Sequence, residues 1–160
     1  MKPVVTSLNI GGARSGIRPR GGDTAIDKRP VDTIEVRDPG PKRGGLGSGV
    51  LGDDVVSRKH HGGSQQAVYA VAREELDWWG AELGRDLRDG MFGENLTTLG
   101  LDVDAAVVGQ RWTVGSAVLE VLRWDSPVQV NGRTALEATE LFGVPAPRGT
   151  TTMILQGAGN

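Results

Sequence analysis

The residues with the clearest chemical potential are the only two histidines of the chain, His60 and His61, which are followed by Gly62 and Gly63. On a strand, adjacent side chains point to opposite faces, so a strand here would prevent the pair from sharing one metal ion. A metal site would also need a third ligand from elsewhere, which Asp or Glu would have to supply. Two other readings stay open: a histidine held by backbone hydrogen bonds at a turn, or an anion site formed by successive N–H groups of the glycine turn.

A second chemically promising stretch is GMFGENLTTLGL, residues 90–101. One reading is a glycine turn that leads into a strand, with Asn95 bonded to nearby backbone and with Thr97 and Thr98 in the strand. The alternative is a binding or catalytic site, in which Asn95 donates and accepts hydrogen bonds and Glu94 acts as an acceptor or base. The spacing of the residues favours the structural reading.

The short basic segment IDKRPV, residues 26–31, is a third candidate. It could bind an anion, but a solvated charged face is the commoner explanation for such a segment. The sequence contains no dinucleotide fingerprint, phosphate-binding loop, nucleophile elbow or HExxH zinc motif that would suggest another chemistry.

Composition excludes several classes of function. The chain has no cysteine, which rules out disulfides, zinc–thiolate sites, cysteine-ligated iron–sulfur clusters and cysteine nucleophiles within it. A net charge of -2 gives no overall attraction to nucleic acid or to acidic membranes. No apolar run approaches about 18 residues, so we expect no membrane span. The N-terminus lacks a signal peptide pattern, and we expect a cytoplasmic protein.

The elements that must position these residues are mostly short strands. The chain has 25 glycines, against about 11 expected from average usage, which favours strands joined by tight turns. One helix is expected, with Ala72, Leu76, Trp79 and Leu83 on its apolar face and Gly84 after its end. A hairpin turn is expected at 131–132 and a second short helix at 135–142. Strands are expected at 4–10, 33–37, 105–108, 111–114, 117–122, 128–130 and 151–155. This pattern predicts a mostly β fold with a few helices, a barrel or sandwich, in a single domain 1–160.

Several segments together resemble the MOSC domain, which is found at the C-terminus of molybdenum-cofactor sulfurases. They are IDKRPV (26–31), GDDVVSRKHHGG (52–63), QAVYAVAREELDWW (66–79), LGR (83–85), GMFGENLTTLGLD (90–102) and VGQRWTVGSAVLEV (108–121). The stand-alone bacterial YiiM-like group is the most similar branch. The resemblance covers roughly residues 1–121 and leaves the tail 122–160 unmatched.

The resemblance implies a fold rich in β-barrel and the binding of molybdenum cofactor (molybdopterin), or of a related anionic ligand. In the family the metal is held by the cofactor's dithiolene and a protein thiolate. The associated chemistry is sulfur carriage or reduction of N-hydroxylated compounds, which implies a redox partner protein; pyridoxal phosphate binding is also associated. The positions that match the family's cofactor-binding residues are His61, Gly62, Gly63, Gly93, Glu94, Asn95, Leu96 and Thr97.

The sequence departs from the family where a Pro-Arg-x-Pro-Cys stretch should follow 117–121. Val128 stands at the cysteine position, and Trp124 and Asp125 replace the first proline and the arginine. Valine can neither ligate molybdenum nor carry a persulfide. Three hypotheses stay open: a ligand-binding MOSC protein without cysteine chemistry, a molybdoenzyme with Asp125 or Ser126 as an oxygen ligand, and a non-catalytic scaffold or interaction protein. Strands of the tail could also pair between chains in an oligomer.

Overall fold

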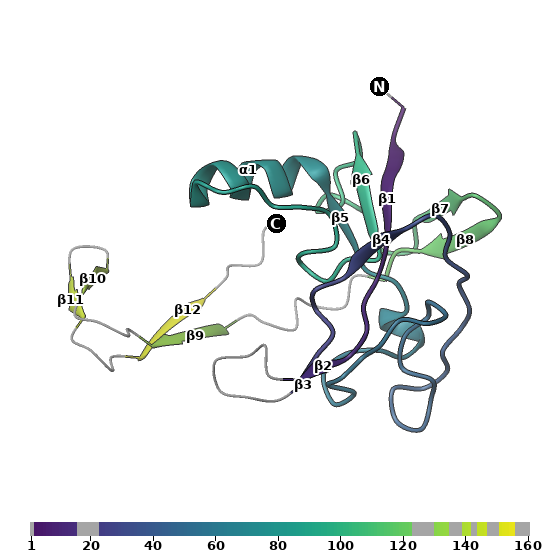
Figure 1. Cartoon of the computed structure of the whole chain (residues 1–160), viewed down its shortest axis with the longest axis horizontal. Helices are drawn as coiled ribbons and strands as arrows, with labels where there is room; N and C mark the ends of the chain where they lie inside the picture. The colour runs from purple at the N-terminus through teal and green to yellow at the C-terminus, as the bar shows by residue number, and fades with distance from the viewer. Residues whose placement is uncertain are drawn as a thin grey trace. The chain divides into compact units, whose positions relative to one another are not determined.

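A computed structural model describes residues 2–15, 23–122, 130–134, 139–141, 144–146 and 151–155. The chain divides into two compact units, residues 1–122 and residues 123–160, and each is considered by itself (Figure 1). The single-domain organisation inferred from the sequence stays a prediction.

The first unit is built on a mixed four-stranded sheet in the order β4-β1-β6-β5. Its longest strand, β1 (Val4–Ile10), pairs antiparallel with both β4 (Arg29–Val31) and β6 (Leu96–Leu99). The short strand β5 (Ala70–Ala72) runs parallel to β6. The sheet therefore joins the motif segment around β6 to the N-terminal strand.

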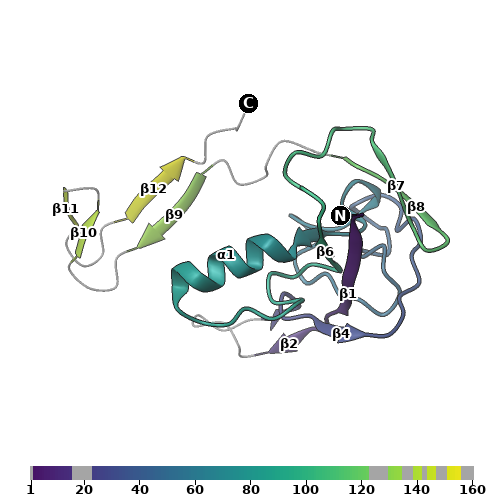
Figure 2. The same cartoon turned by 90° about the horizontal axis from the view of Figure 1, so that it is seen from above.

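The predicted helix is confirmed as α1 (Arg73–Leu83), which follows β5 directly. Gly84 ends it in the left-handed conformation, φ 61°, because a residue without a Cβ adopts this geometry at little energetic cost. The predicted apolar face is only partly buried: Leu76 is fully buried, whereas Trp79 and Leu83 are about half exposed. Figure 2 shows that α1 begins beside the sheet and extends away from it.

The hydrophobic core of the first unit is small. Val71 of β5, Leu76 of α1 and Leu87 form a buried cluster, against which Met91 and Phe92 pack. Met91 and Phe92 belong to the predicted motif 90–101, so the core anchors one end of that motif.

The remaining described strands form two-stranded sheets. In the first unit, β2 (Arg14–Ser15) pairs with β3 (Asp23–Thr24), and β7 (Arg111–Val114) pairs with β8 (Ala117–Glu120). In the second unit, β9 (Val130–Thr134) pairs with β12 (Thr151–Leu155), and β10 (Thr139–Leu141) pairs with β11 (Val144–Ala146). A mostly β class with a few helices is confirmed, because α1 and the 3-10 turn η1 (Ser64–Gln66) are its described helices. The strands described here do not close into a barrel.

Some local predictions are wrong in the first unit. The segment 33–37 is no strand and contributes one isolated bridge, from Val36 to Val50, while 105–108 forms turns. The segment 111–114 is a strand as predicted, and 117–122 is a strand up to Glu120, in which Val118 is 63% exposed. The β7–β8 hairpin pairs only with itself among the described strands.

In the second unit, tertiary pairing overrides local propensity. The predicted turn pair Asn131 and Gly132 lies inside β9, opposite Ile154 and Met153 of β12. A strand, β10, occupies 139–141 of the predicted helix 135–142, and the strand predicted at 151–155 is confirmed as β12. The other residues of these predictions, 128–129, 135–138 and 142, lie outside the described part of the chain. In the described part, no helix is both long and apolar enough to cross a membrane.

Candidate functional site

The two histidines lie in a turn rather than on a strand. The backbone N–H groups of His60 and His61 both donate to the carbonyl of Ser57, at 3.0 and 2.9 Å, and both side chains are exposed. The turn confirms the reading in which backbone hydrogen bonds hold this segment. In the described part of the chain, no three His, Cys, Asp or Glu side chains are grouped so that they could hold a metal ion.

The two glycines after the histidines allow two loops to approach each other closely. Gly62 and Gly63 are buried with φ of 85° and 82°. A Cβ on Gly62 would lie 2.7 Å from the Gly47 carbonyl oxygen, and one on Gly63 would lie 2.8 Å from the Lys42 nitrogen. The Gly63 N–H donates to that Gly47 carbonyl at 2.9 Å. The N–H groups of His61 and Gly63 are therefore engaged within the chain and not directed at an external anion.

Residues 37–47 and 57–64, called the paired loops below, are fastened together by side chains as well. The Lys42 ammonium donates to the His60 carbonyl at 3.0 Å, and the Arg58 guanidinium donates to the Gly45 carbonyl at 3.3 Å. The Ser64 hydroxyl donates to the Asp38 carboxylate, which together with the Gly40 N–H lowers the pKa of Asp38 below its usual range. These bonds give the paired loops a defined shape despite their glycine content.

Glu94 closes the turn that precedes β6. Its carboxylate is fully buried and accepts hydrogen bonds from the Gly90 N–H at 2.5 Å, the Phe92 N–H at 3.0 Å and the Thr97 hydroxyl at 3.2 Å. Gly93, with φ 87°, permits the chain to turn between these bonds. All three donors come from the same short segment, so the carboxylate stabilises this turn and faces no solvent as a base would need to.

Asn95 forms hydrogen bonds in both directions, as its chemistry allows, and every partner belongs to the chain. Its side-chain oxygen accepts from the Tyr69 N–H at 3.3 Å, and its amide nitrogen donates to the Asn9 carbonyl at 3.1 Å and to the Asp53 carboxylate at 3.2 Å. The Asn9 amide in turn donates to the Thr97 hydroxyl at 3.2 Å. Asn95 thus ties three separate segments together below the surface.

Asp53 is the centre of this buried network, and the sequence did not single it out. Its carboxylate accepts from the Lys28 ammonium at 2.6 Å, the Ser48 hydroxyl at 2.7 Å, the Gly11 N–H at 2.8 Å and Asn95. Desolvation lowers the pKa of Lys28, and the adjacent Asp53 carboxylate opposes that shift. The reading of the basic segment 26–31 as a solvated face is wrong for Lys28, whose side chain is only 8% exposed.

The two motifs are connected through residues 47–53. At one end of this segment, the Gly47 carbonyl accepts from Gly63 in the paired loops. At the other end, Asp53 accepts from Asn95, and Ser48 bonds to Asp53 between them. Three of the predicted site residues lie in the paired loops: His61, Gly62 and Gly63. The other five lie in the buried network, in β6 or in the turn before it: Gly93, Glu94, Asn95, Leu96 and Thr97.

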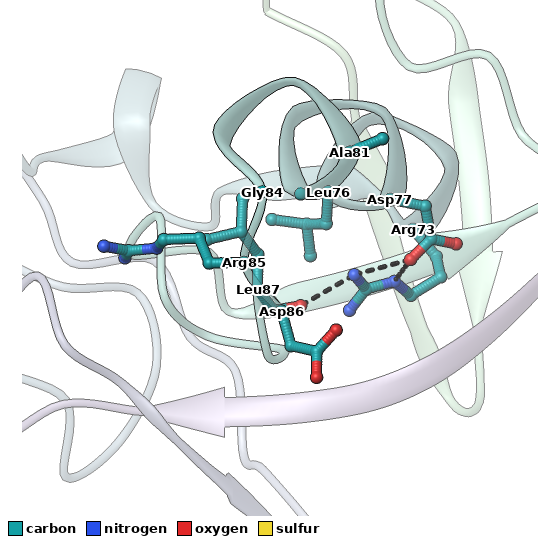
Figure 3. Close-up of a pocket in the computed structure, with 9 residues that line it drawn as sticks. Arg73, Leu76, Asp77, Ala81, Gly84, Arg85, Asp86 and Leu87 are labelled. Carbon is teal, nitrogen blue, oxygen red and sulfur yellow. Dashed lines mark hydrogen bonds and ion pairs between the residues drawn. The ribbon is translucent and has the colours of Figure 1, made fainter.

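A hollow of about 640 Å³ lies elsewhere, along α1 and the chain that follows it (Figure 3). The Arg73 guanidinium, on one side of it, is held by Asp77 at 2.9 Å, Asp89 at 2.7 Å and the Leu87 carbonyl at 2.7 Å. In Figure 3 the Arg85 side chain extends away from this group. None of the predicted site residues lines the hollow.

A pair of carboxyl groups links the start of α1 to the loop that follows β6. Glu75 is hydrogen-bonded to Asp104, and burial, that bond and the charges of Asp104 and Asp102 raise the pKa of Glu75 to about 7. Beside it, the Glu74 carboxylate accepts from the Gly100 N–H at 2.7 Å. The loop 100–104 is therefore attached to α1 by a contact whose protonation changes near neutral pH.

Comparison with known proteins decides the family. The model of the MOSC domain matches residues 57–141, which is 85 of the 160 residues of the chain. This chain belongs to the MOSC domain family. The match begins at the paired loops, includes α1 and β6, and continues beyond residue 121, where the sequence resemblance was expected to stop.

Two relatives of this MOSC protein are similar over parts of their length. The uncharacterized protein YflK of Bacillus subtilis is 34% identical over 70 residues, which is 44% of this chain and 32% of YflK. The crystal structure of YiiM from Geobacillus stearothermophilus matches 75% of this chain and 50% of that chain, with 28% identity and a TM-score of 0.49. The MOSC chain thus spans about a third of YflK and half of YiiM.

The residues of this MOSC chain do not fit a thiolate-bound molybdenum centre. No cysteine occurs at any of its 160 positions, and Val128, Asp125 and Ser126 lie outside the described residues. The side chains of Glu94 and Asn95 are buried and bonded within the chain. The close approaches of Gly62 and Gly63 are to protein backbone, so these glycines do not leave a cradle for a ligand.

Proposed function

We propose that this chain is a MOSC-domain binding protein that acts without the thiolate-dependent molybdenum chemistry associated with its family. The observation that carries the proposal is that the side chains of Glu94, Asn95 and Thr97 form hydrogen bonds with other residues inside the fold, and do not face an open site. The absence of cysteine supports it, because a thiol is needed both to carry a persulfide and to supply a sulfur ligand.

In this proposal the motif residues have a supporting role. The turn held by Glu94 and the network around Asp53 fix the segment 47–53, and that segment holds the paired loops through Gly47. Function then depends on what the paired loops present at the surface. A cytoplasmic location stays a prediction of the sequence.

A second candidate function is the binding of a molybdopterin-type or related anionic ligand. The exposed His61 favours it, because that side chain lies in the paired loops beside the cationic Arg58 and Lys59. In this candidate His61 would contact the anion, while Gly62, Gly63 and Gly93 shape the turns, and Glu94, Asn95, Leu96 and Thr97 hold them in place. Any metal ligand would be an oxygen donor such as Asp125 or Ser126.

The experiment that separates the two candidates is an analysis of protein purified from a host that makes molybdenum cofactor. Molybdenum is measured by elemental analysis, pterin by mass analysis, and pyridoxal phosphate is assayed on the same sample. We expect the folded wild-type chain to contain none of them in stoichiometric amount. Stoichiometric molybdenum and pterin, lost in His61→Ala, would overturn the first candidate and support the second. A Val128→Cys variant that gains molybdenum would identify the missing thiolate as the cause.

A further inference from the structure

Positive charge in this chain is concentrated in the paired loops. The chain has 18 Lys and Arg residues, of which the paired loops hold five and the rest of the chain 13. It has 20 Asp and Glu residues, of which the paired loops hold one and the rest of the chain 19. A net charge of +4 therefore sits on two short segments of a chain whose remainder carries -6. The five basic residues are Arg37, Lys42, Arg43, Arg58 and Lys59.

These cations are exposed and are not neutralised locally. All five side chains are exposed, and none makes an ion pair with the described residues. Lys42 and Arg58 donate only to carbonyl oxygens, and the loops' one acid, Asp38, is bonded to Ser64 and Gly40. The positive field of the paired loops is thus directed to solvent, where it can attract an anionic partner.

We propose that the paired loops form a docking surface for an acidic protein partner. The proposal deepens the binding function proposed above, and it rests on that function. The bonds that join the loops, including Gly63 N–H to the Gly47 carbonyl and Lys42 to the His60 carbonyl, order the surface before binding. A preordered surface loses less conformational entropy when a partner binds.

A protein fits this surface better than a small anion or a nucleic acid does. Neither loop lines the hollow described above, and the N–H groups of His61 and Gly63 already donate to carbonyls of the chain, so these two groups are not directed at a small anion. The paired loops contain no Phe, Tyr or Trp on which bases could stack. They do expose Leu46, at 55%, among their cations, which suits an apolar contact surrounded by charge pairs.

The test uses the full chain and a fluorescently labelled 20-residue peptide of Glu, Asp and Leu, followed by anisotropy at increasing ionic strength. The test variant is Arg43→Glu/Lys59→Glu, because these two side chains make no hydrogen bond that fastens the described loops. The control is Lys2→Glu/Arg85→Glu, which changes net charge equally outside the loops. We expect the peptide to bind in a salt-sensitive manner, the test variant to weaken binding by about tenfold, and the control by less than about twofold.

Several outcomes would overturn the docking surface. They are no peptide binding, equal weakening in the control, or tighter binding of an oligodeoxynucleotide, inorganic pyrophosphate or phosphatidylglycerol vesicles than of the peptide. A salt-sensitive dimer in sedimentation, lost in the test variant, would assign the surface to a second copy of the chain instead. Molybdenum content is measured on the same preparations, so cofactor in the wild type would overturn the proposed function while the peptide result is judged separately.

Discussion

Replacing Asp53 should reveal how strongly the buried network supports this fold. In Asp53→Ala, the ammonium of Lys28 loses its counter-charge 2.6 Å away, and three further donors, on Ser48, Gly11 and Asn95, lose an acceptor. Removing one partner of a buried ion pair typically costs about 3–5 kcal/mol, because the other charge stays buried and uncompensated. Each unsatisfied donor can add about 1–3 kcal/mol, although contributions of neighbours in one network do not sum.

We therefore expect Asp53→Ala to lower the free energy of unfolding by about 3–5 kcal/mol, a large part of the roughly 5–15 kcal/mol available to a natural protein. The measurement is urea unfolding at neutral pH, followed by the fluorescence of the tryptophans. The matched control is Asp54→Ala, because the exposed Asp54 carboxylate accepts one bond, from the Ala13 N–H at 2.8 Å. Its loss should cost no more than about 1 kcal/mol.

The pH dependence of the variant gives a second check on the reasoning. Burial lowers the pKa of Lys28, and without Asp53 nothing comparable opposes that shift. The unfolded state of the variant then binds more protons than its folded state. The loss in the free energy of unfolding caused by Asp53→Ala should therefore shrink as pH rises toward the ordinary pKa of lysine. Lys28→Met/Asp53→Ala should recover part of the loss by removing the buried charge. An Asp53→Ala variant within about 1 kcal/mol of wild type, or no recovery in the double variant, would refute this account.

Three further predictions follow from single sites. The pKa of Glu75 is raised from 4.5 to about 7 in the folded state, so between these pH values the folded state binds a proton that the unfolded state has lost. The free energy of unfolding should therefore fall as pH rises from 4.5 to about 7 and then level off. Urea unfolding across this range should lose that slope in Glu75→Gln, and an unchanged slope would show that the carboxyl pair with Asp104 is not its source. Gly62→Ala should lower the free energy of unfolding by about 2 kcal/mol or more, measured by thermal or urea unfolding, because φ at this position is 85° and the new Cβ would lie 2.7 Å from the Gly47 carbonyl oxygen. A variant as stable as the wild type would contradict the close packing of the loops. Glu94→Gln should lower the free energy of unfolding by about 1–3 kcal/mol, because the amide cannot accept hydrogen bonds from two N–H groups and a hydroxyl as the carboxylate does. The rate of amide hydrogen exchange in residues 90–97 should rise in the same variant.

Local sequence signals predicted the elements that local physics controls. The strand predicted at 4–10 is β1, and the helical period with Gly84 after it gave α1 and its end. These signals work because one segment's backbone preferences and periodicity act within a few residues. They failed for Asn131 and Gly132, where pairing with β12 outweighs the turn preference of the dipeptide.

The sequence also drew attention to the right segments without revealing how their residues act. The pairs that define the site join residues far apart in the chain, such as Lys28 with Asp53 and Asn9 with Thr97. Spacing within one segment carries no information about such partners. The sequence therefore favours a solvated face for IDKRPV and does not single out Asp53, although the fold buries Lys28 and Asp53 as one ion pair.

By itself, the sequence determined that this MOSC chain supplies no thiolate, because no arrangement of a chain without cysteine can create one. It also determined the excess of positive charge in 37–47 and 57–64, since charge is a property of composition. Only the tertiary structure decided that Glu94 and Asn95 face inward and that the two basic segments lie together with their cations exposed. The physical reason is that burial and hydrogen-bond partnership depend on which distant segments meet, and that is settled by packing rather than by any one stretch of residues.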